Sequence, residues 1–209
     1  MTFVIYCLIF ATIAYLFGSI PSAVWIGKSF YKIDVREHGS RNAGATNTFR
    51  ILGRKAGIIV LLMDVLKGVI VVLIPKLFLK ELSQELEIQI QLISGIFVFL
   101  GHLFPIFAQF RGGKGVATSL GIIIGIHPPA AGISFLIFLV VFLGSKYVSL
   151  GAIVASFFFP IIVLFIFKEN SECLNGFSLV IGITVILTHK KNILRIIKGE
   201  ENKMNLFKR

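Results

Sequence analysis

The chain has 209 residues, 56% of them hydrophobic, and its mean hydropathy is +0.91. A soluble domain is usually about 45–50% apolar, whereas several runs here are long enough to cross a bilayer. The formal net charge of +11 would suggest nucleic acid in a soluble protein, but basic residues also mark the cytoplasmic loops of membrane proteins. These values favour an all-α integral membrane protein, and we expect no nucleic-acid partner.

Seven apolar runs, taken in chain order, predict membrane-spanning helices over 3–26, 57–76, 90–108, 116–127, 129–145, 147–167 and 177–188. The stretch 116–145 is ambiguous, since it could be one long span or two short ones separated by Pro128-Pro129. No internal repeat or low-complexity linker is visible, so we expect one domain over residues 1–209.

The distribution of basic residues favours two short helices in the ambiguous stretch. With an outer N-terminus, seven spans place ten basic residues from Lys28 to Lys146 on the inner side, together with the seven in the C-terminal segment. Lys76, Lys80 and Lys168 then lie outside, whereas one long span would divide the basic residues evenly. The positive-inside rule therefore predicts seven transmembrane helices, an outer N-terminus and a cytoplasmic C-terminus.

The first inner loop, over residues 27–57, is rich in small polar residues. Small residues let backbone amides approach a ligand closely, Ser, Thr and Asn offer neutral hydrogen bonds, and Arg can bind phosphate through two nitrogens. An ordinary cytoplasmic turn with a basic stop is the alternative. The candidate ligand-binding residues are Ser40, Asn42, Gly44, Thr46, Asn47 and Arg50.

The second polar segment is a Gly-Gly-Lys-Gly sequence before the helix predicted from residue 116. Backbone amides at a helix start can cradle an anion, and a lysine adds a full positive charge; the members are Gly112, Gly113, Lys114 and Gly115. The segment is not a Walker A loop, because Ala108 stands at the first glycine position and Gly115 replaces the magnesium-binding Ser or Thr. His102, a few residues earlier, is either a buried structural histidine or a site residue.

The third polar segment follows the last apolar run. On a helix, His189 and Asn192 are three residues apart and share a face. The alternative is a basic helix that lies in the lipid headgroups, which suits Lys190, Lys191 and Lys198 better than it suits the histidine and asparagine.

Two features lie inside predicted spans. Asp64 and Lys67 are three residues apart, and charges at that depth are costly unless they are paired or face a polar cavity. We favour a structural ion pair over a proton or ion path. The sequence Gly-Ser-Ile-Pro at 18–21 predicts a kink and a close helix contact.

In this order, the motifs resemble the bacterial membrane-bound acyl-phosphate:glycerol-3-phosphate acyltransferase family. The resemblance covers nearly the whole chain and is carried by Gly18-Ser19-Ile20-Pro21, the polar stretch 39–53, Asp64-x-x-Lys67-Gly68, Gly101-His102-x-x-Pro105-x-Phe107, the stretch 112–118, and His189-x-x-Asn192-Ile193-x-Arg195. Arg41 departs from the family pattern, which looks like a glycine there, and this affects the expected geometry of the loop.

The resemblance implies a seven-helix fold in the bacterial cytoplasmic (inner) membrane, with its active site at the cytoplasmic surface. It also implies transfer of a fatty acyl group from acyl phosphate to the 1-hydroxyl of sn-glycerol 3-phosphate. The products are 1-acylglycerol 3-phosphate and phosphate, in the first acylation of phospholipid synthesis. The expected partners are these two substrates and membrane lipids, with neither acyl-CoA nor acyl carrier protein as donor. We expect no metal and no other cofactor. Asp34 and Asp64 are the only aspartates, so the sequence has no Asp-rich magnesium site for diphosphate chemistry.

The resemblance and the residue chemistry together suggest roles. The catalytic candidates are Ser40, Arg50, Lys114, His189 and Asn192. Substrate-binding candidates are Asn42, Gly44, Thr46, Asn47, His102, Gly112, Gly113 and Gly115, and Glu201 resembles a family position with a structural role. The family ties the glycine segment to glycerol 3-phosphate, but the residues alone leave open which phosphate each group binds. They also leave open whether His189 or the phosphate of the donor is the general base.

Two other classes remain open from the residues alone. A small transporter of an organic phosphate would use the same basic groups, with Asp64 and Lys67 as a gating element. No repeated halves are visible, however, and the motifs lie on one face rather than at the midplane. A non-catalytic lipid-organising protein would not need His189 and Asn192.

Overall fold

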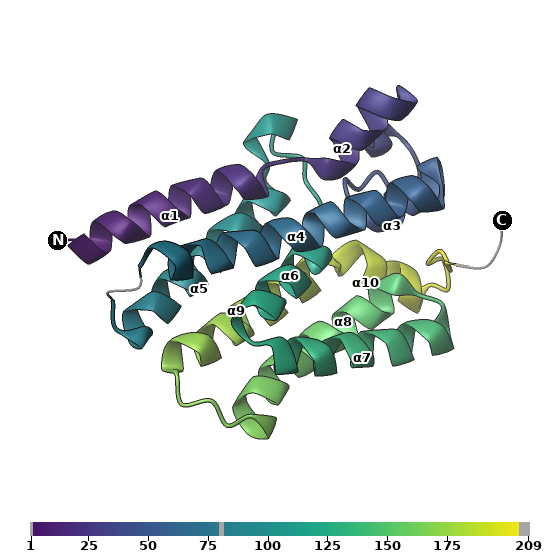
Figure 1. Cartoon of the computed structure of the whole chain (residues 1–209). Coiled ribbons are helices and arrows are strands. Elements are labelled where there is room, and N and C mark those ends of the chain that lie inside the picture. The colour runs from purple at the N-terminus through teal and green to yellow at the C-terminus, as the bar shows by residue number, and fades with distance from the viewer. Residues whose placement is uncertain (1, 80–81, 205–209) are drawn as a thin grey trace. The chain divides into compact units, whose positions relative to one another are not determined.

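The computed structural model describes residues 2–79 and 82–204, and these ranges are helical, with no strand (Figure 1). The α-helices of the described residues are α1 Thr2–Gly18, α2 Ser22–Ile26, α3 Ala45–Leu52, α4 Arg54–Phe78, α5 Gln84–Leu103, α6 Val116–Ile126, α7 Pro128–Ser145, α8 Val148–Ile161, α9 Glu172–Thr188 and α10 Lys190–Ile197. Short π-helical turns are η1 Gly27–Tyr31 and η4 Ile162–Ile166, and short 3₁₀ turns are η2 Val35–Glu37 and η3 Ile106–Ala108. The predicted all-α class is confirmed.

The chain forms two compact units, Met1–Ile126 and His127–Arg209. The first unit contains the polar segments around α3 and before α6, and the second contains the polar segment around α10. A single domain over the whole chain stays a prediction.

In the first unit, α1 and α5 pack closely through glycines. A side chain at Gly18 would meet the backbone of Val98, and one at Gly101 would meet the carbonyl of Tyr15. The Tyr15 hydroxyl also donates a 2.9 Å hydrogen bond to the carbonyl of Phe104. The close contact that the Gly-Ser-Ile-Pro sequence predicts is therefore present.

Helices α4 and α6 approach each other in the same way. A Cβ atom at Gly68 would meet the Thr118 carbonyl, and one at Gly121 would meet the Val65 carbonyl. Small residues at helix crossings let the backbones approach and gain van der Waals contact, which drives helix association in lipid. Short helix α6 is thus held against the much longer α4.

The predicted first span, 3–26, is interrupted at the Gly-Ser-Ile-Pro sequence, where a kink is predicted. Helix α1 ends at Gly18, and α2 begins at Ser22 after a non-helical Pro21 with φ −89° and ψ 73°. Proline has no N–H and disfavours helical geometry at the residue before it, so it breaks the helix here. The helical segment then continues through η1 and ends at Lys32, whose backbone is left-handed with φ 57°.

Two helices begin earlier than the predicted spans 90–108 and 177–188, and Glu85 and Glu172 lie in their first turns. The side chains of Ser83 and Ser171 accept hydrogen bonds from the backbone amides of Leu86 and Leu174. A serine cap followed by an acidic first turn stabilises a helix start. The apolar runs alone could not mark these polar first turns.

The ambiguous stretch 116–145 contains two helices, because α6 ends at Ile126 and α7 begins at Pro128. His127 between them is non-helical, with φ −141° and ψ 75°, and its Nδ1 accepts from the Ala130 amide at 3.1 Å. One continuous helix is therefore excluded, as the charge distribution predicts.

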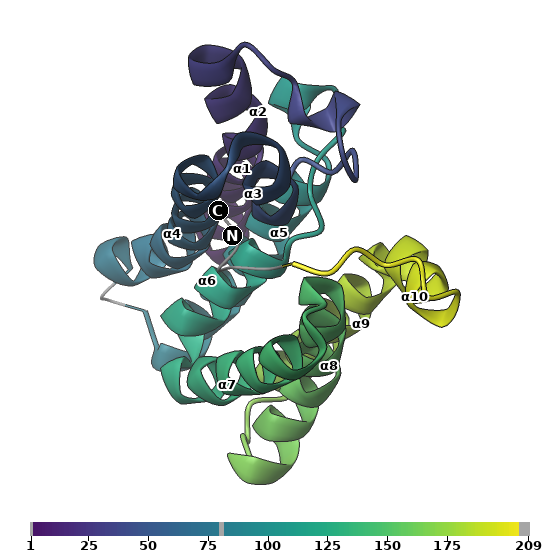
Figure 2. The same cartoon turned by 90° about the vertical axis from the view of Figure 1, so that its right-hand side faces the viewer.

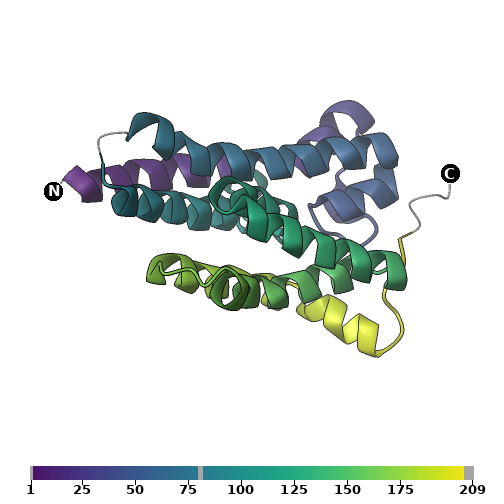
Figure 3. The same cartoon turned by 60° about the horizontal axis from the view of Figure 1, so that its bottom comes forward.

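The second unit is built from α7, α8 and α9, with α8 packed against both other helices (Figures 2 and 3). A side chain at Gly151 of α8 would press on Phe138 of α7. One at Gly182 of α9 would meet the Ser156 carbonyl and Pro160 of α8. Small residues again mark the close helix contacts.

Among the described residues, five helical stretches are long and apolar enough to cross a membrane: Phe3–Tyr31, Arg54–Phe78, Gln84–Ala108, Pro128–Ser145 and Val148–Ile166. Helices α9 and α10 form a sixth candidate if the pair, bent by 55°, is one span. Helix α6 has 11 residues and is shorter than these. A helical protein with several membrane spans is thus confirmed, while the count of seven stays a prediction.

Candidate active site

The loop before α3 is organised around one buried amide, that of Asn47, which is 1% exposed. Its Oδ1 accepts from the Ser40 backbone amide at 2.9 Å. Its Nδ2 donates to the carbonyls of Val35 and His38 at 2.7 and 3.1 Å. Three hydrogen bonds from one side chain thus fix the path of residues 35–40, and a substrate contact by Asn47 stays a prediction.

A group of ionic contacts, called the clamp below, links this loop to η3, the turn after α5. Arg36 donates through Nε and Nη2 to the Asp34 carboxylate and through Nη1 to the Ala108 carbonyl at 2.8 Å. Lys28 pairs with the same carboxylate at 3.2 Å. The hydrogen bonds from Arg36 hold the pKa of the Asp34 carboxyl well below its usual range, so the clamp is ionised at neutral pH. Sequence reasoning missed these residues, because nothing in the pattern links position 36 to position 108.

The predicted polar residues lie around the start of α3. Gly44 is its N-cap, and Ser40, Asn42 and Thr46 are partly buried, while Arg50 in the last turn is exposed. Arg41 has a positive φ of 58°, the backbone region that favours glycine. This geometry agrees with a family pattern that looks like a glycine at that position.

The Gly-rich segment 112–115, called the cradle below, contacts His102. The Gly113 amide donates to the His102 carbonyl at 3.1 Å. A Cβ atom at Gly112 would meet that carbonyl, and one at Gly113 would meet the ring atom Nε2. Only glycine therefore fits at these two positions without displacing His102.

The cradle leads directly into α6. Gly115 has a φ of +81° and lies against the Phe99 ring, and its carbonyl accepts the Ser119 amide at 2.7 Å. Lys114 is partly buried beside it. Glycine backbone, a lysine and the positive end of a helix form an arrangement suited to a phosphate group.

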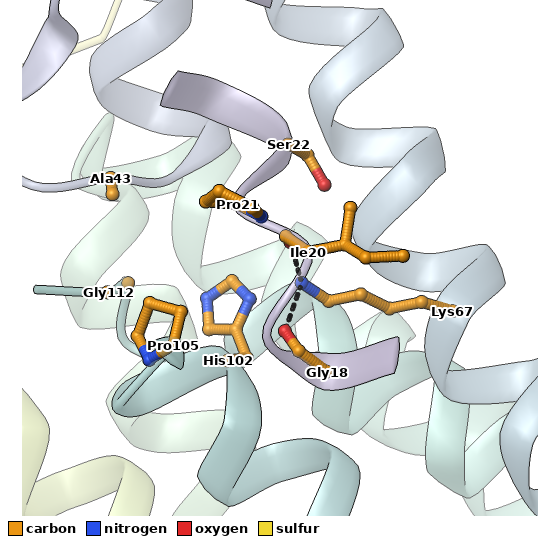
Figure 4. A pocket seen from close by; sticks show the side chains of 10 residues that line it. Gly18, Ile20, Pro21, Ser22, Ala43, Lys67, His102, Pro105 and Gly112 are labelled. Carbon is orange, nitrogen blue, oxygen red and sulfur yellow. Dashed lines mark hydrogen bonds between the residues drawn. The ribbon is translucent and has the colours of Figure 1, made fainter. Parts of the chain in front are cut away.

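A small pocket, partly open to solvent, adjoins the cradle. Figure 4 shows His102, Pro105 and Gly112 at one side and Gly18 and Ile20, at the α1–α2 break, at the other. The lining residues are Gly18, Ile20, Pro21, Ser22, Ala43, Lys67, His102, Pro105, Gly112 and Gly113. The pocket therefore brings His102, two cradle glycines and the α3 loop residue Ala43 together.

The predicted ion pair inside the first unit is confirmed. Lys67 Nζ lies 2.9 Å from Asp64 Oδ1. The same oxygen accepts from the Ser22 hydroxyl at 2.9 Å and lies 3.6 Å from His102 Nδ1. Sequence reasoning did not single out Ser22 or link this pair to His102.

In the second unit, the Glu201 carboxylate contacts three side chains. Its Oε1 accepts from Asn192 Nδ2 at 2.6 Å and from the Ser149 hydroxyl at 2.8 Å. Its Oε2 lies 3.1 Å from Arg195 Nε, at ion-pair distance. These contacts connect α10 and the segment after it to the start of α8.

His189 lies at the junction of α9 and α10 and is 3% exposed. Its Nδ1 lies 2.7 Å from the Val185 carbonyl. A carbonyl only accepts, so Nδ1 carries the proton, and in the neutral ring Nε2 has the lone pair. This tautomer is the one that a general base acting through Nε2 requires.

Comparison with known proteins gives the family. The family model described as "Glycerol-3-phosphate acyltransferase" matches residues 8–199. The chain belongs to this family. A glycerol-3-phosphate acyltransferase of Fusobacterium nucleatum is 45% identical over 194 residues, which cover 93% of this chain and 96% of the relative. One from Listeria monocytogenes serovar 1/2a is 45% identical over 197 residues, covering 94% and 96%.

Solved structures of a family member agree. The chain resembles the crystal structure of PlsY (YgiH), an integral membrane glycerol 3-phosphate acyltransferase, in its glycerol 3-phosphate form. The TM-score is 0.87 at 37% identity, with 97% of this chain and 99% of that chain covered. For the lysophosphatidic acid form of PlsY, the TM-score is 0.82 at 36% identity, with 95% of each chain covered.

The predicted site residues fall into two groups. The first unit holds Ser40, Asn42, Gly44, Thr46, Asn47, Arg50, His102 and residues 112–115, whereas the second holds His189, Asn192 and Glu201. The structure joins His102 to the cradle glycines and Ser40 to Asn47 by direct contacts. The functional role of each residue stays a prediction.

Proposed function

We propose that this protein transfers a fatty acyl group from acyl phosphate to the 1-hydroxyl of sn-glycerol 3-phosphate. The products are 1-acylglycerol 3-phosphate (lysophosphatidic acid) and inorganic phosphate. The observation that carries the proposal is the cradle, in which glycine amides and Lys114 precede α6, in a chain of this acyltransferase family. Both substrates carry a phosphate, and such a cradle suits that group.

Acyl phosphate is a mixed anhydride and is already activated, so the reaction needs orientation and charge stabilisation more than a strong catalyst. The 1-hydroxyl oxygen attacks the acyl carbon, a new ester C–O bond forms, and the bond from that carbon to the phosphate oxygen breaks. The leaving phosphate takes the electron pair. The hydroxyl proton goes to His189 or to the phosphate of the donor, and no acyl-enzyme forms.

In the first unit we assign the phosphate of glycerol 3-phosphate to the cradle, with Lys114 as its counter-charge. Ser40, Asn42, Gly44 and Thr46 would bind the remaining phosphate and glycerol oxygens, with Arg50 as the second cation. Asn47, whose amide is engaged in the loop, would act by holding Ser40 in place. His102 would act through its carbonyl, which accepts the Gly113 amide of the cradle.

In the second unit we assign catalytic roles to His189 and Asn192 and a structural role to Glu201. The contact with Val185 supports Nε2 of His189 as the basic nitrogen. The Glu201 carboxylate, bonded to Ser149 and Asn192, would keep the asparagine oriented. Loss of Glu201 would then disturb α10 as well as the reaction.

We further propose the membrane arrangement. The chain has seven spans in the cytoplasmic (inner) membrane, with its N-terminus outside and its C-terminus and active site on the cytoplasmic side. The excess of basic residues in the segments assigned to that side supports this orientation. Membrane lipids surround the spans, and neither acyl-CoA nor acyl carrier protein serves as the donor.

The experiment compares donors and one matched pair of variants. Purified protein in a lipid phase receives glycerol 3-phosphate with either palmitoyl phosphate or palmitoyl-CoA, and lysophosphatidic acid is measured. We expect product only with palmitoyl phosphate and a loss of about 100-fold in Lys114→Gln, because the counter-charge of the bound glycerol 3-phosphate is removed. Arg111→Gln, which removes an exposed cation next to the cradle, should keep activity within about 3-fold. Equal losses in both variants, or product from palmitoyl-CoA, would contradict the assignment.

A further inference from the structure

The buried cluster around Asp64 has no role in the reaction as proposed above. We propose that Asp64 and Lys67 are positioning residues that hold the cradle in place through His102. The inference rests on the proposed function, because it concerns the site that would bind the phosphate of glycerol 3-phosphate.

Asp64 is the centre of the cluster. Its Oδ1 lies within 2.9 Å of both Ser22 Oγ and Lys67 Nζ, and within 3.6 Å of His102 Nδ1. The four side chains are between 2% and 7% exposed. A charge buried inside a span is costly when it is unpaired, so the carboxylate and the ammonium must keep each other in place.

Lys67 connects the cluster to the break between α1 and α2. Besides Asp64, its Nζ donates to the carbonyls of Gly18 and Ile20 at 3.2 and 3.3 Å (Figure 4). An ammonium has three donors, and these three contacts use all of them. Lys67 therefore fixes the chain where the helix is interrupted and is poorly suited to be a mobile gating charge.

His102 connects the Asp64 cluster to the cradle. Nδ1 of its ring faces Asp64. Nε2 lies so close to Gly113 that a Cβ atom there would clash with it. The His102 carbonyl accepts the Gly113 amide. Because no side chain separates the ring from the cradle backbone, a shift of His102 must move Gly112 and Gly113. A misplacement of about 1 Å can cost on the order of 100-fold in rate.

The helices around the cluster have contacts of their own. Gly18 packs on Val98 and Gly68 on Thr118 through backbone atoms. The mild change Ser22→Ala, which removes one donor to Asp64, should therefore leave the fold intact. It should still loosen the carboxylate that His102 faces.

The test measures glycerol 3-phosphate binding by calorimetry and the KM of each substrate, using full-length protein in lipid nanodiscs. The variants are Ser22→Ala and Asp64→Asn. The control is Ser94→Ala, another buried serine, which donates to the Ile90 carbonyl within α5. We expect Ser22→Ala to weaken glycerol 3-phosphate binding about 5-fold, the equivalent of one hydrogen bond, and Asp64→Asn to weaken it more. The KM for palmitoyl phosphate should change by less than about 2-fold, and Ser94→Ala should match the wild type.

The substrate selectivity decides the outcome, because a merely structural role would affect both substrates. Unchanged glycerol 3-phosphate binding in folded Ser22→Ala overturns the inference, as do equal changes in both KM values. If Asp64→Asn does not fold, Ser22→Ala decides alone. If the wild type binds glycerol 3-phosphate, Ser22→Ala weakens that binding and no product forms, the proposed function is refuted and the positioning role stands. A wild type that does not bind glycerol 3-phosphate refutes both.

Discussion

Asn47 shows how a single side chain can organise a functional loop. The sequence predicts it as a substrate ligand because it lies among small polar residues near a membrane surface. The structure uses its amide to bind the backbone of Val35, His38 and Ser40. Residue types alone identify this loop as a candidate site. The hydrogen-bond partners of Asn47 depend on the path of the loop backbone, which no periodic sequence pattern predicts.

Arg41 provides a stability prediction at the residue scale. A non-glycine residue in the left-handed region costs about 1–2 kcal/mol, and the Arg41 side chain is exposed. Arg41→Gly should therefore raise the free energy of unfolding by up to about 1 kcal/mol and raise the melting temperature in detergent. Arg41→Ala removes the same side chain without relieving the backbone, so it should not stabilise. Equal effects of the two substitutions would contradict this explanation.

The clamp between Asp34 and Arg36 predicts a pH dependence. The folded pKa of Asp34 is depressed, so its contribution is complete above the unfolded pKa of about 3.9 and declines as the pH falls towards the folded value. Asp34→Asn should destabilise the protein by about 1–3 kcal/mol, the value of hydrogen bonds to a charged group. The deficit should be constant from pH 5 to 7 and shrink below about pH 4.

Melting temperatures of wild type and Asp34→Asn over this pH range measure the effect. Glu200→Gln, at an exposed acidic position, is the control and should show little difference at any pH. A deficit for Asp34→Asn that grows with acidity would have the wrong sign.

At the level of elements, sequence pattern predicts helices better than their ends. The division of 116–145 follows from Pro128-Pro129 and the basic loops, because proline favours a helix start and interrupts a longer one. Helices α5 and α9 start earlier than hydropathy predicts, because a serine cap with an acidic first turn is as polar as a loop. The π-helical turns η1 and η4 have no sequence signal that distinguishes them from ordinary helix.

The packing of α4 on α6 predicts opposite effects for two helical glycines. A Cβ atom at Gly121 would clash with the Val65 carbonyl, whereas one at Gly132 of α7 would meet nothing within 4 Å. Gly121→Ala should destabilise by about 1–3 kcal/mol through overpacking. Gly132→Ala should be neutral or stabilising by up to about 1 kcal/mol through helix propensity. Thermal unfolding of the two variants side by side measures this, and a shift of the same sign and size in both would refute the close contact.

At the scale of the whole molecule, the order of motifs along the chain predicts the family, and comparison confirms it. The contacts among the motifs could not be predicted. Ser22 and Asp64 are 42 residues apart, and no periodicity brings them together. Within the first unit, the helix packing places the α1–α2 break, α4 and the end of α5 around one carboxylate.

The proposed topology predicts the side of the membrane from which one native and one introduced cysteine react with a maleimide. Cys173 is exposed at the start of α9 and should be labelled by an impermeant maleimide added outside intact cells in a Cys7→Ser background. With both native cysteines replaced by serine, Asn202→Cys, at an exposed position, should react only after the cells are opened. The reverse pattern would contradict the orientation inferred from the basic residues.

The reaction itself tests the account most directly. Purified wild-type protein, given palmitoyl phosphate and glycerol 3-phosphate without CoA, carrier protein or metal, should release phosphate and form 1-acylglycerol 3-phosphate in equal amounts. Direct transfer requires this equality, because each C–O bond made to glycerol breaks one acyl phosphate bond. Phosphate release without the acylated product, or neither product from demonstrably folded protein, would contradict the acyltransferase assignment and make phosphate-ester uptake by sealed vesicles the next measurement.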